Sequence, residues 1–130
     1  MKLIKFLSMS LILGLMMIPL TACTNAKANY QQISAQEAKN LMDTEKNYII
    51  LDTRTQEEFA EGHIDGARLI PEYEIAQRAE KELPDKSALI LVYCRSGRRS
   101  KIASEELVKL GYTNVKEFGG IIDWPYEVVK

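Results

Sequence analysis

An apolar run of β-forming residues leads directly into a polar, cationic segment in the second half of the chain. The run covers residues 88–93, the segment covers 94–100, and an amphipathic helical pattern follows Ser100. Between Lys86 and Ser104 the chain has five cationic side chains and no carboxylate. A strand that passes through a short turn into a helix is typical of α/β proteins, which bind ligands at such turns.

The rest of the chain alternates between strand and helix patterns. Short apolar runs predict strands at residues 48–51, 68–70, 88–93 and 114–118. Capping boxes, a proline at a helix start and a glycine at a helix end predict helices over residues 35–42, 56–61, 71–83 and 101–110. The two glycines at 119–120 are expected to form a turn. Strands that alternate with helices predict an α/β fold, with a parallel sheet covered on both sides.

Two polar residues directly follow buried strands. Cys94 follows the strand at 88–93, and Asp52 follows the strand at 48–51. Because parallel strands place their carboxyl ends at one edge of the sheet, we expect Cys94 and Asp52 at the same ligand-binding edge.

The first 22 residues have the layout of a secretory signal peptide. Lys2 and Lys5 precede a mostly apolar stretch that ends at Leu20, and small residues follow. Polar residues, a glycine and a proline interrupt this stretch, so it is a poor transmembrane helix. Residues 20–23 resemble the lipobox of bacterial lipoproteins, in which a cysteine such as Cys23 is acylated. The alternative is an ordinary signal peptide with an incidental cysteine.

These features divide the chain into three parts. Residues 1–22 are expected to be a lipoprotein signal peptide, 23–32 a lipid-anchored tether and 33–130 the folded domain. The lipid on Cys23 would hold an exported protein on a membrane, facing the periplasm or the cell exterior.

Charge and cysteine content exclude several classes of partner. The chain has 17 basic and 18 acidic residues, and removal of Lys2 and Lys5 leaves 15 against 18, a net charge near −3. Nucleic acid is therefore not expected as a partner. With Cys23 acylated, Cys94 is the one free thiol and His63 the one histidine, which is too few ligands for a metal site. We expect neither a metal nor an organic cofactor.

Cys94 is the candidate nucleophile. Loop amides, nearby cations and the positive end of a helix dipole all favour the anionic form of a thiol, whose ordinary pKa is about 8.5. We therefore expect Cys94 to ionise readily, with the backbone N–H groups of 95–100 directed at the sulfur. Gly97 permits the tight turn that this arrangement needs. The same cradle suits an anionic substrate.

Two blocks of the sequence resemble the rhodanese family, specifically its small, single-domain, exported members. The first block, at 51–71, contains Leu-Asp-Thr-Arg and Gly-His-Ile-Asp-Gly-Ala. The second, at 92–124, contains Cys-Arg-Ser-Gly-Arg-Arg-Ser and Gly-Gly-Ile. The resemblance covers nearly all of the chain from Tyr30 onward, in family order and at family spacing.

The resemblance implies both a fold and an activity. The implied fold is a three-layer α/β/α arrangement with a five-stranded, mainly parallel sheet. The implied protein is a sulfurtransferase that carries a sulfane sulfur as a persulfide on Cys94. Its donor would be a small anion such as thiosulfate, and its acceptor cyanide, a thiol or another protein.

The residues that follow Cys94 are expected to bind the substrate: Arg95, Ser96, Gly97, Arg98, Arg99 and Ser100. The three arginines would attract an anionic donor and help its oxyanion to leave. At least one of the three is expected simply to face solvent.

Three charged residues are assigned to structural support, namely Asp52, Arg54 and Glu58. We expect Arg54 to pair with a carboxylate such as Glu58 rather than to act in catalysis. His63, in a glycine-containing turn, is interpreted as a structural histidine rather than a general base, and Trp124 as a core residue.

Two other functions fit part of the pattern. Phosphatases and arsenate reductases of related folds hold an oxyanion with a cysteine, five residues and an arginine. Here that last position is Ser100, and Arg99 falls one residue early. The shorter loop should fit one sulfur atom better than a phosphoryl group. The second alternative is a persulfide carrier or redox-sensing module that serves a partner protein with the same loop chemistry.

Overall fold

The computed structural model describes residues 29–130, and five parallel strands lie at the centre of this part of the chain. The strands are β1 (Gln31–Gln32), β2 (Ile49–Asp52), β3 (Arg68–Leu69), β4 (Ile90–Cys94) and β5 (Val115–Gly120). Their order across the sheet is β1-β5-β4-β2-β3, and each neighbouring pair is parallel. The expected α/β fold with a five-stranded parallel sheet is confirmed.

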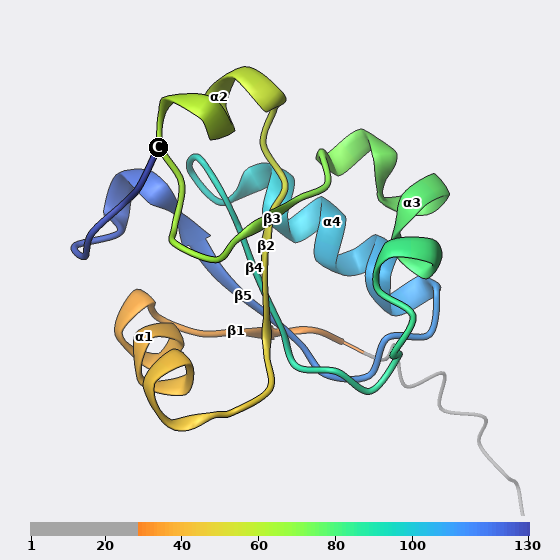
Figure 1. Ribbon diagram of the computed structural model, residues 1–130. Coiled ribbons are helices and arrows are strands. Elements are labelled where there is room, and N and C mark those ends of the chain that lie inside the picture. The colour runs from red at the N-terminus through yellow and green to blue at the C-terminus, as the bar shows by residue number, and fades with distance from the viewer. Residues whose placement is uncertain (1–28) are drawn as a thin grey trace, which may run out of the picture.

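Helices cover both faces of this sheet (Figure 1). The helices are α1 (Ala35–Thr44), α2 (Gln56–Glu61), α3 (Ile75–Glu82) and α4 (Arg98–Lys109), with 3-10 turns η1 (Glu72–Glu74) and η2 (Ile121–Asp123). α1 lies on one face, and α3 and α4 lie side by side on the other. The layers are those of a three-layer α/β/α protein.

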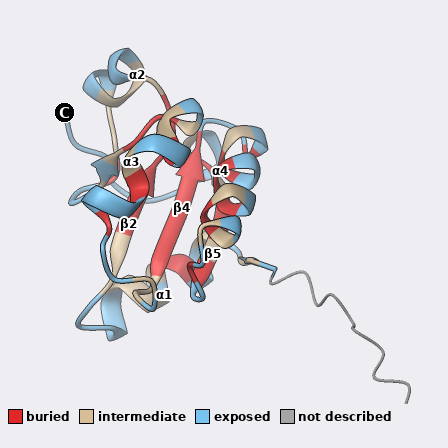
Figure 2. Ribbon diagram, turned by 90° about the vertical axis from the view of Figure 1, so that its right-hand side faces the viewer, coloured by how far each residue is buried: buried red, intermediate tan, exposed pale blue. Residues whose placement is uncertain are grey.

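The central strand β4 separates two hydrophobic clusters. Ile90 and Val92 pack on the side of α3 and α4, whereas Leu91 and Tyr93 pack on the side of α1. All five residues of β4 are buried, as the red arrow in Figure 2 shows. A strand covered on both faces needs a continuous apolar run, and this explains why the sequence predicts β4 so clearly.

Local signals set the starts of α1 and α2. The hydroxyl groups of Ser34 and Thr55 accept hydrogen bonds from the backbone N–H three residues later. The carboxylates of Glu37 and Glu58 accept the N-cap backbone N–H in return. Both predicted capping boxes are confirmed.

Two loop boundaries around Cys94 differ from the predicted ones. α4 begins at Arg98 rather than after Ser100, because Gly97 ends the loop in a left-handed conformation with a φ of 106°. Residues 119–120 end β5 instead of forming a turn. The positive φ of Gly119, 88°, nevertheless interrupts the regular pairing of β5 with β4.

The predicted tether is wrong at its end. Gln31 and Gln32 form the edge strand β1, paired with Lys116 and Glu117 of β5. Backbone pairing with a neighbouring strand orders these polar residues, and no local sequence pattern predicts this pairing. The predicted signal peptide, the predicted lipidation site Cys23 and the rest of the tether up to residue 28 lie outside the described residues.

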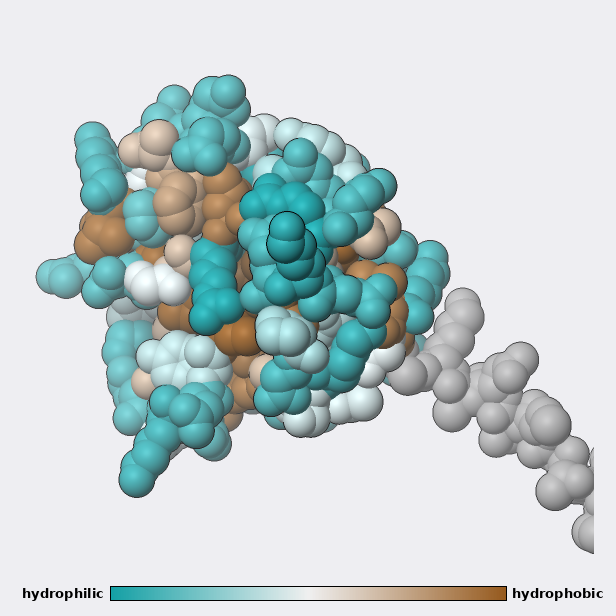
Figure 3. Space-filling view, turned by 45° about the vertical axis from the view of Figure 1, so that its right-hand side comes forward, coloured by the Kyte–Doolittle hydropathy of each residue, from teal (hydrophilic) through white to brown (hydrophobic). Residues whose placement is uncertain are grey.

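The surface is mostly polar on the face drawn in Figure 3, with smaller hydrophobic areas between hydrophilic side chains. No helix within residues 29–130 has the length and apolar character needed to cross a membrane.

Candidate active site

Cys94 ends β4, and its thiol is buried under the loop that follows, with 1% of the residue exposed. Its Sγ accepts a hydrogen bond from Gly97 N at 3.0 Å and lies 3.3 Å from Ser100 Oγ. Within the described part of the chain, Gly97 supplies the one backbone N–H that donates to Sγ, rather than the whole run expected from 95 to 100. Since Gly97 is the N-cap of α4, the sulfur lies at the positive end of that helix.

The loop after Cys94 rests directly on the end of β5. Gly120 is paired with Cys94, and a Cβ atom at position 120 would overlap the backbone of Arg95 and lie 2.6 Å from Ser96 Cα. Ile122 N donates a hydrogen bond to Arg95 O at 3.2 Å. The missing side chain of Gly120 therefore makes room for the loop that covers the thiol.

Glu117 lies beneath this loop, although the sequence does not single it out. It is 3% exposed, and its Oε1 accepts hydrogen bonds from Ser100 Oγ at 2.7 Å and from Gly119 N at 2.8 Å. The sequence offers one signal. Val115 faces the core, and residue 117 of the same strand must face the same side. A glutamate beside Lys116 in a short strand otherwise suggests exposure.

Arg99 is bound to the start of α2. Its Nη1 and Nη2 donate to Oε1 and Oε2 of Glu58 at 2.7 and 2.9 Å. Hydrogen bonding from Arg99, helped by its charge and by the groups of Thr55, outweighs partial burial and lowers the pKa of Glu58 from 4.5 to about 2. The Glu58 carboxylate therefore joins the first turn of α2 to the first turn of α4.

The other two loop arginines face solvent. Arg95, Ser96 and Arg98 are exposed, and no carboxylate within residues 29–130 pairs with either arginine. The positive charge available to an incoming anion at the loop surface is therefore that of Arg95 and Arg98.

Asp52 and Arg54 form a buried ion pair at the end of β2. Arg54 Nη2 donates to Asp52 Oδ2 at 2.7 Å, and the two side chains are 6% and 0% exposed. Arg54 Nη2 also donates to Gly62 O at 2.6 Å, which fixes the end of α2. Arg54 forms the expected structural pair with a carboxylate, but that carboxylate is Asp52 rather than Glu58. Asp52 is the neighbour within reach, and Glu58 is held by Arg99.

His63 and Trp124 take part in packing. His63 Nδ1 lies 2.9 Å from Phe59 O, and the two rings stack with centroids 3.7 Å apart. Trp124 is buried in the cluster on the side of α1, against Phe118. The structure gives neither residue a contact with the thiol.

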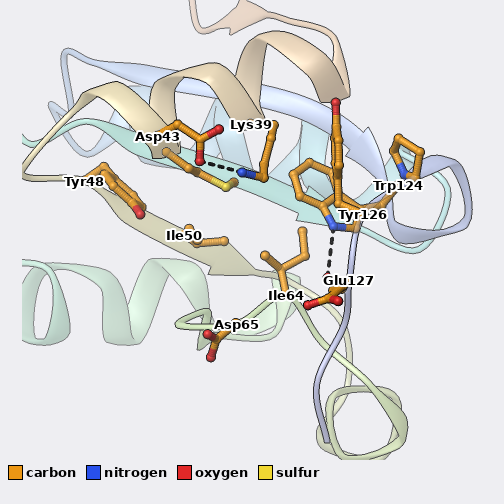
Figure 4. Close-up of a pocket in the computed structure, with 11 residues that line it drawn as sticks. Lys39, Asp43, Tyr48, Ile50, Ile64, Asp65, Trp124, Tyr126 and Glu127 are labelled. Atoms are coloured by element: carbon orange, nitrogen blue, oxygen red, sulfur yellow. Dashed lines mark hydrogen bonds and ion pairs between the residues drawn. The ribbon is translucent and has the colours of Figure 1, made fainter.

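A pocket beside α1 is separate from the thiol (Figure 4). Its lining residues come from α1, β2, the segment after α2 and the chain after η2, and none comes from 94–100. Lys39 and Asp43 form an ion pair at its rim, and Tyr126 meets Trp124 edge to face. No cysteine lines this pocket, so the candidate site built on the thiol lies at Cys94.

These features define an α/β protein with a buried cysteine at the carboxyl end of its central strand. Within residues 29–130, no three side chains of His, Cys, Asp or Glu are grouped so that they could hold a metal ion.

Comparisons with known proteins identify the family. The family model of the rhodanese-like domain matches residues 34–125, and the chain belongs to this family. The chain is 39% identical over 80 residues to the thiosulfate sulfurtransferase PspE of Escherichia coli K12, a match that covers 62% of this chain and 77% of PspE. It is 40% identical over 88 residues to a sulfurtransferase of Allochromatium vinosum, which covers 67% of this chain and 79% of that protein.

One further relative is much longer than this chain, and another match is a solved structure. The chain spans only 24% of the adenylyltransferase and sulfurtransferase UBA4 of Candida albicans, to which it is 31% identical. A solved structure of a rhodanese with anions from E. coli matches with a TM-score of 0.60 and 37% identity, over 64% of this chain and 98% of that one. Sulfur transfer is the activity named for PspE, for the A. vinosum protein and for UBA4.

Proposed function

We propose that this protein is a thiosulfate sulfurtransferase that carries the transferred sulfur as a persulfide on Cys94. The observation that carries the proposal is the position of Cys94 Sγ, which accepts the Gly97 N–H at the N-terminus of α4. This position favours negative charge on the sulfur. The exposed guanidinium groups of Arg95 and Arg98 would attract a dianionic donor to the loop.

The reaction has two halves. The Cys94 thiolate attacks the outer sulfur of thiosulfate, a new S–S bond forms, and the bond to the inner sulfur breaks as sulfite leaves with its electron pair. Cyanide or a thiolate then attacks the outer sulfur of the persulfide, and the Cys94 thiolate is regenerated. Ping-pong kinetics are expected, and a protein thiol could replace the small acceptor.

The geometry argues against hydrolysis of phosphate esters. Ser100 occupies the position of the arginine that would clamp a phosphoryl group. Arg99 cannot replace it without leaving Glu58, to which it is bound through both terminal nitrogens. We therefore expect no turnover of aryl phosphates.

We further propose that a lipid on Cys23 holds the domain at a membrane, on the exported side. The support is the signal-like N-terminus and the lipobox-like residues 20–23. A Cys23→Ser variant should move from the membrane fraction to the soluble fraction with its sulfur transfer unchanged, and a variant that stays bound would contradict the anchor.

A thiosulfate–cyanide assay of the full chain tests the activity. We expect thiocyanate to form with wild type and not with Cys94→Ser, while both proteins unfold at the same urea concentration. Thiocyanate formation by Cys94→Ser, or turnover of an aryl phosphate without thiocyanate, would contradict the proposal. Loading of Cys94 without turnover by cyanide or thiols would instead favour a carrier for a protein partner.

A further inference from the structure

The buried carboxylate of Glu117 has no part in the reaction described so far. It faces α4 from β5, and within residues 29–130 no lysine or arginine forms an ion pair with it. A buried carboxylate without a cation costs free energy that a neutral side chain at the same position would avoid. Such a group beside a nucleophile is a candidate for proton transfer.

One hydrogen bond of Glu117 supports the backbone. Its Oε1 accepts Gly119 N at 2.8 Å, where the pairing of β5 with β4 is interrupted. The amide oxygen of a glutamine could accept this bond as well. The support of Gly119 therefore requires an acceptor at position 117 but no ionisable group.

The other hydrogen bond leads to the sulfur. Ser100 Oγ lies 2.7 Å from Glu117 Oε1, 3.3 Å from Cys94 Sγ and 3.0 Å from Gly97 O. A serine hydroxyl has one proton and donates one hydrogen bond at a time. While Cys94 is a thiol, its S–H donates to Ser100 and the Ser100 hydroxyl donates to Glu117. Once Cys94 is a thiolate, the Ser100 hydroxyl donates to the sulfur. A protonated Glu117 can then donate a hydrogen bond to Ser100 Oγ, so the contact between these two side chains is kept.

We propose that Glu117 receives the proton of Cys94 through the hydroxyl of Ser100. The S–H bond breaks, Ser100 takes that proton and gives its own to Glu117, and the net charge of the site does not change. The proton stays on Glu117 while the persulfide exists, and it returns along the same path after the acceptor removes the outer sulfur. Cys94 can thus ionise although none of the three groups is open to solvent.

The charged groups around Cys94 and Glu117 are paired with each other, exposed, or directed elsewhere. The charged groups on the strand ends and loops around the pair, and on the first turn of α4, are Asp52, Arg54, Arg95, Arg98, Arg99, Lys101 and Lys116, with Glu58 bound to Arg99. Four of them form the two ion pairs already described, three are exposed, and Lys116 lies toward α1, where it acts on Glu37. Two negative charges buried this close would repel each other, so moving the Cys94 proton to Glu117 avoids placing both charges in the site.

Ultraviolet absorbance of the thiolate tests the relay, since it needs no reagent to reach a buried sulfur. Full-length protein is titrated from acid to alkaline pH, and the curve of Cys94→Ser is subtracted to remove the signals of Cys23 and the tyrosines. Two sites that share a proton produce thiolate in two steps, one when the pair loses its first proton and one when it loses its second. We expect two steps in wild type and a single step of full amplitude near the lower one in Glu117→Gln, because the neutral amide resembles the protonated carboxyl group.

Two further variants separate the relay from mere support of the loop. Ser100→Ala keeps Glu117 but removes the hydroxyl that contacts both groups, so its steps should move away from the wild-type pH values. Ser104→Ala is the matched control, because Ser104 is buried one turn further along α4 and its hydroxyl has no hydrogen-bond partner within the described residues. That variant should keep both steps.

A wild-type titration with a single step would overturn the proposal, even if the variants fail to fold. A single wild-type step that moves to lower pH in Glu117→Gln would show simple repulsion by a carboxylate that takes up no proton, and a Glu117→Gln step at the upper wild-type pH would also refute the relay. The inference rests on the proposed function only in taking Cys94 as the reacting group. Because the titration uses no sulfur donor, its outcome is independent of whether thiosulfate loads the protein.

Discussion

The carboxylate of Glu58 and the guanidinium of Arg99 join the first turns of α2 and α4 through hydrogen bonds of 2.7 and 2.9 Å. Glu58 is also the third residue of the α2 capping box, so one side chain supports the helix start and holds the loop arginine. Arg99 therefore stabilises the loop around Cys94, and Arg95 and Arg98 carry the exposed positive charge of the loop.

The pH dependence of stability reports on this pair. The pKa of Glu58 is about 2 in the folded protein against 4.5 ordinarily, so the pair stabilises the fold above the ordinary value. This stabilisation is lost as the pH falls from the ordinary value through the folded one. Wild type should exceed Glu58→Gln by about 1 kcal/mol in the free energy of unfolding near neutral pH. Glutamine can still close the capping box. A difference that stays constant throughout acid urea titrations would contradict the assignment.

The contact of Gly120 with the loop predicts a large effect of a single methyl group. Gly120→Ala would force apart β5 and the backbone of Arg95, at a cost of about 1–3 kcal/mol in the free energy of unfolding. Gly62→Ala is the control, because a Cβ atom there meets Val128 Cγ2 and Val129 O at an ordinary 3.8 Å. Urea unfolding that gives equal losses for the two variants would disprove the close approach.

Breaking the buried ion pair of Asp52 and Arg54 should destabilise the protein more than breaking an exposed ion pair. Asp52→Asn would leave the Arg54 guanidinium buried without its counter-charge and should cost about 3–5 kcal/mol in unfolding free energy. Asp43→Asn breaks an exposed pair with Lys39 on α1 and should cost less than about 1 kcal/mol. Similar losses for both variants in urea unfolding would show that the burial of Asp52 does not matter.

The exposed loop charge predicts an effect on substrate capture. Arg98→Ala should raise the KM for thiosulfate severalfold at low salt, and the difference from wild type should shrink as salt screens the charge. Lys109→Ala removes the same charge from the other end of α4 and should leave KM unchanged. If Arg98→Ala behaves like Lys109→Ala, the loop surface does not attract the donor.

Signals that lie close together in sequence predicted most of the fold. The capping boxes at Ser34 and Thr55 act over three residues, and the apolar run of β4 is a property of one segment. Both could be identified before any tertiary contact was known. Strand β1 could not, because two glutamines become a strand only through their pairing with β5.

The sequence predicted those parts of the candidate site that are neighbours along the chain. It did not predict contacts between residues far apart in sequence. Cys94, Gly97 and Ser100 lie within one strand–loop–helix segment, and that spacing predicted a thiol at a helix start. The bond from Ser100 to Glu117 spans 17 residues, and the pair of Arg99 with Glu58 spans 41. The packing of α4 against β5 and α2 determines these partners, and no local sequence pattern predicts that packing.

Mass spectrometry of the full chain after incubation with thiosulfate tests the central claim, that Cys94 accepts a sulfane sulfur. We predict one added sulfur atom on the peptide that contains residue 94, its removal by cyanide and its absence in Cys94→Ser. An unmodified Cys94 after incubation, or an added sulfur found elsewhere in the chain, would contradict the account.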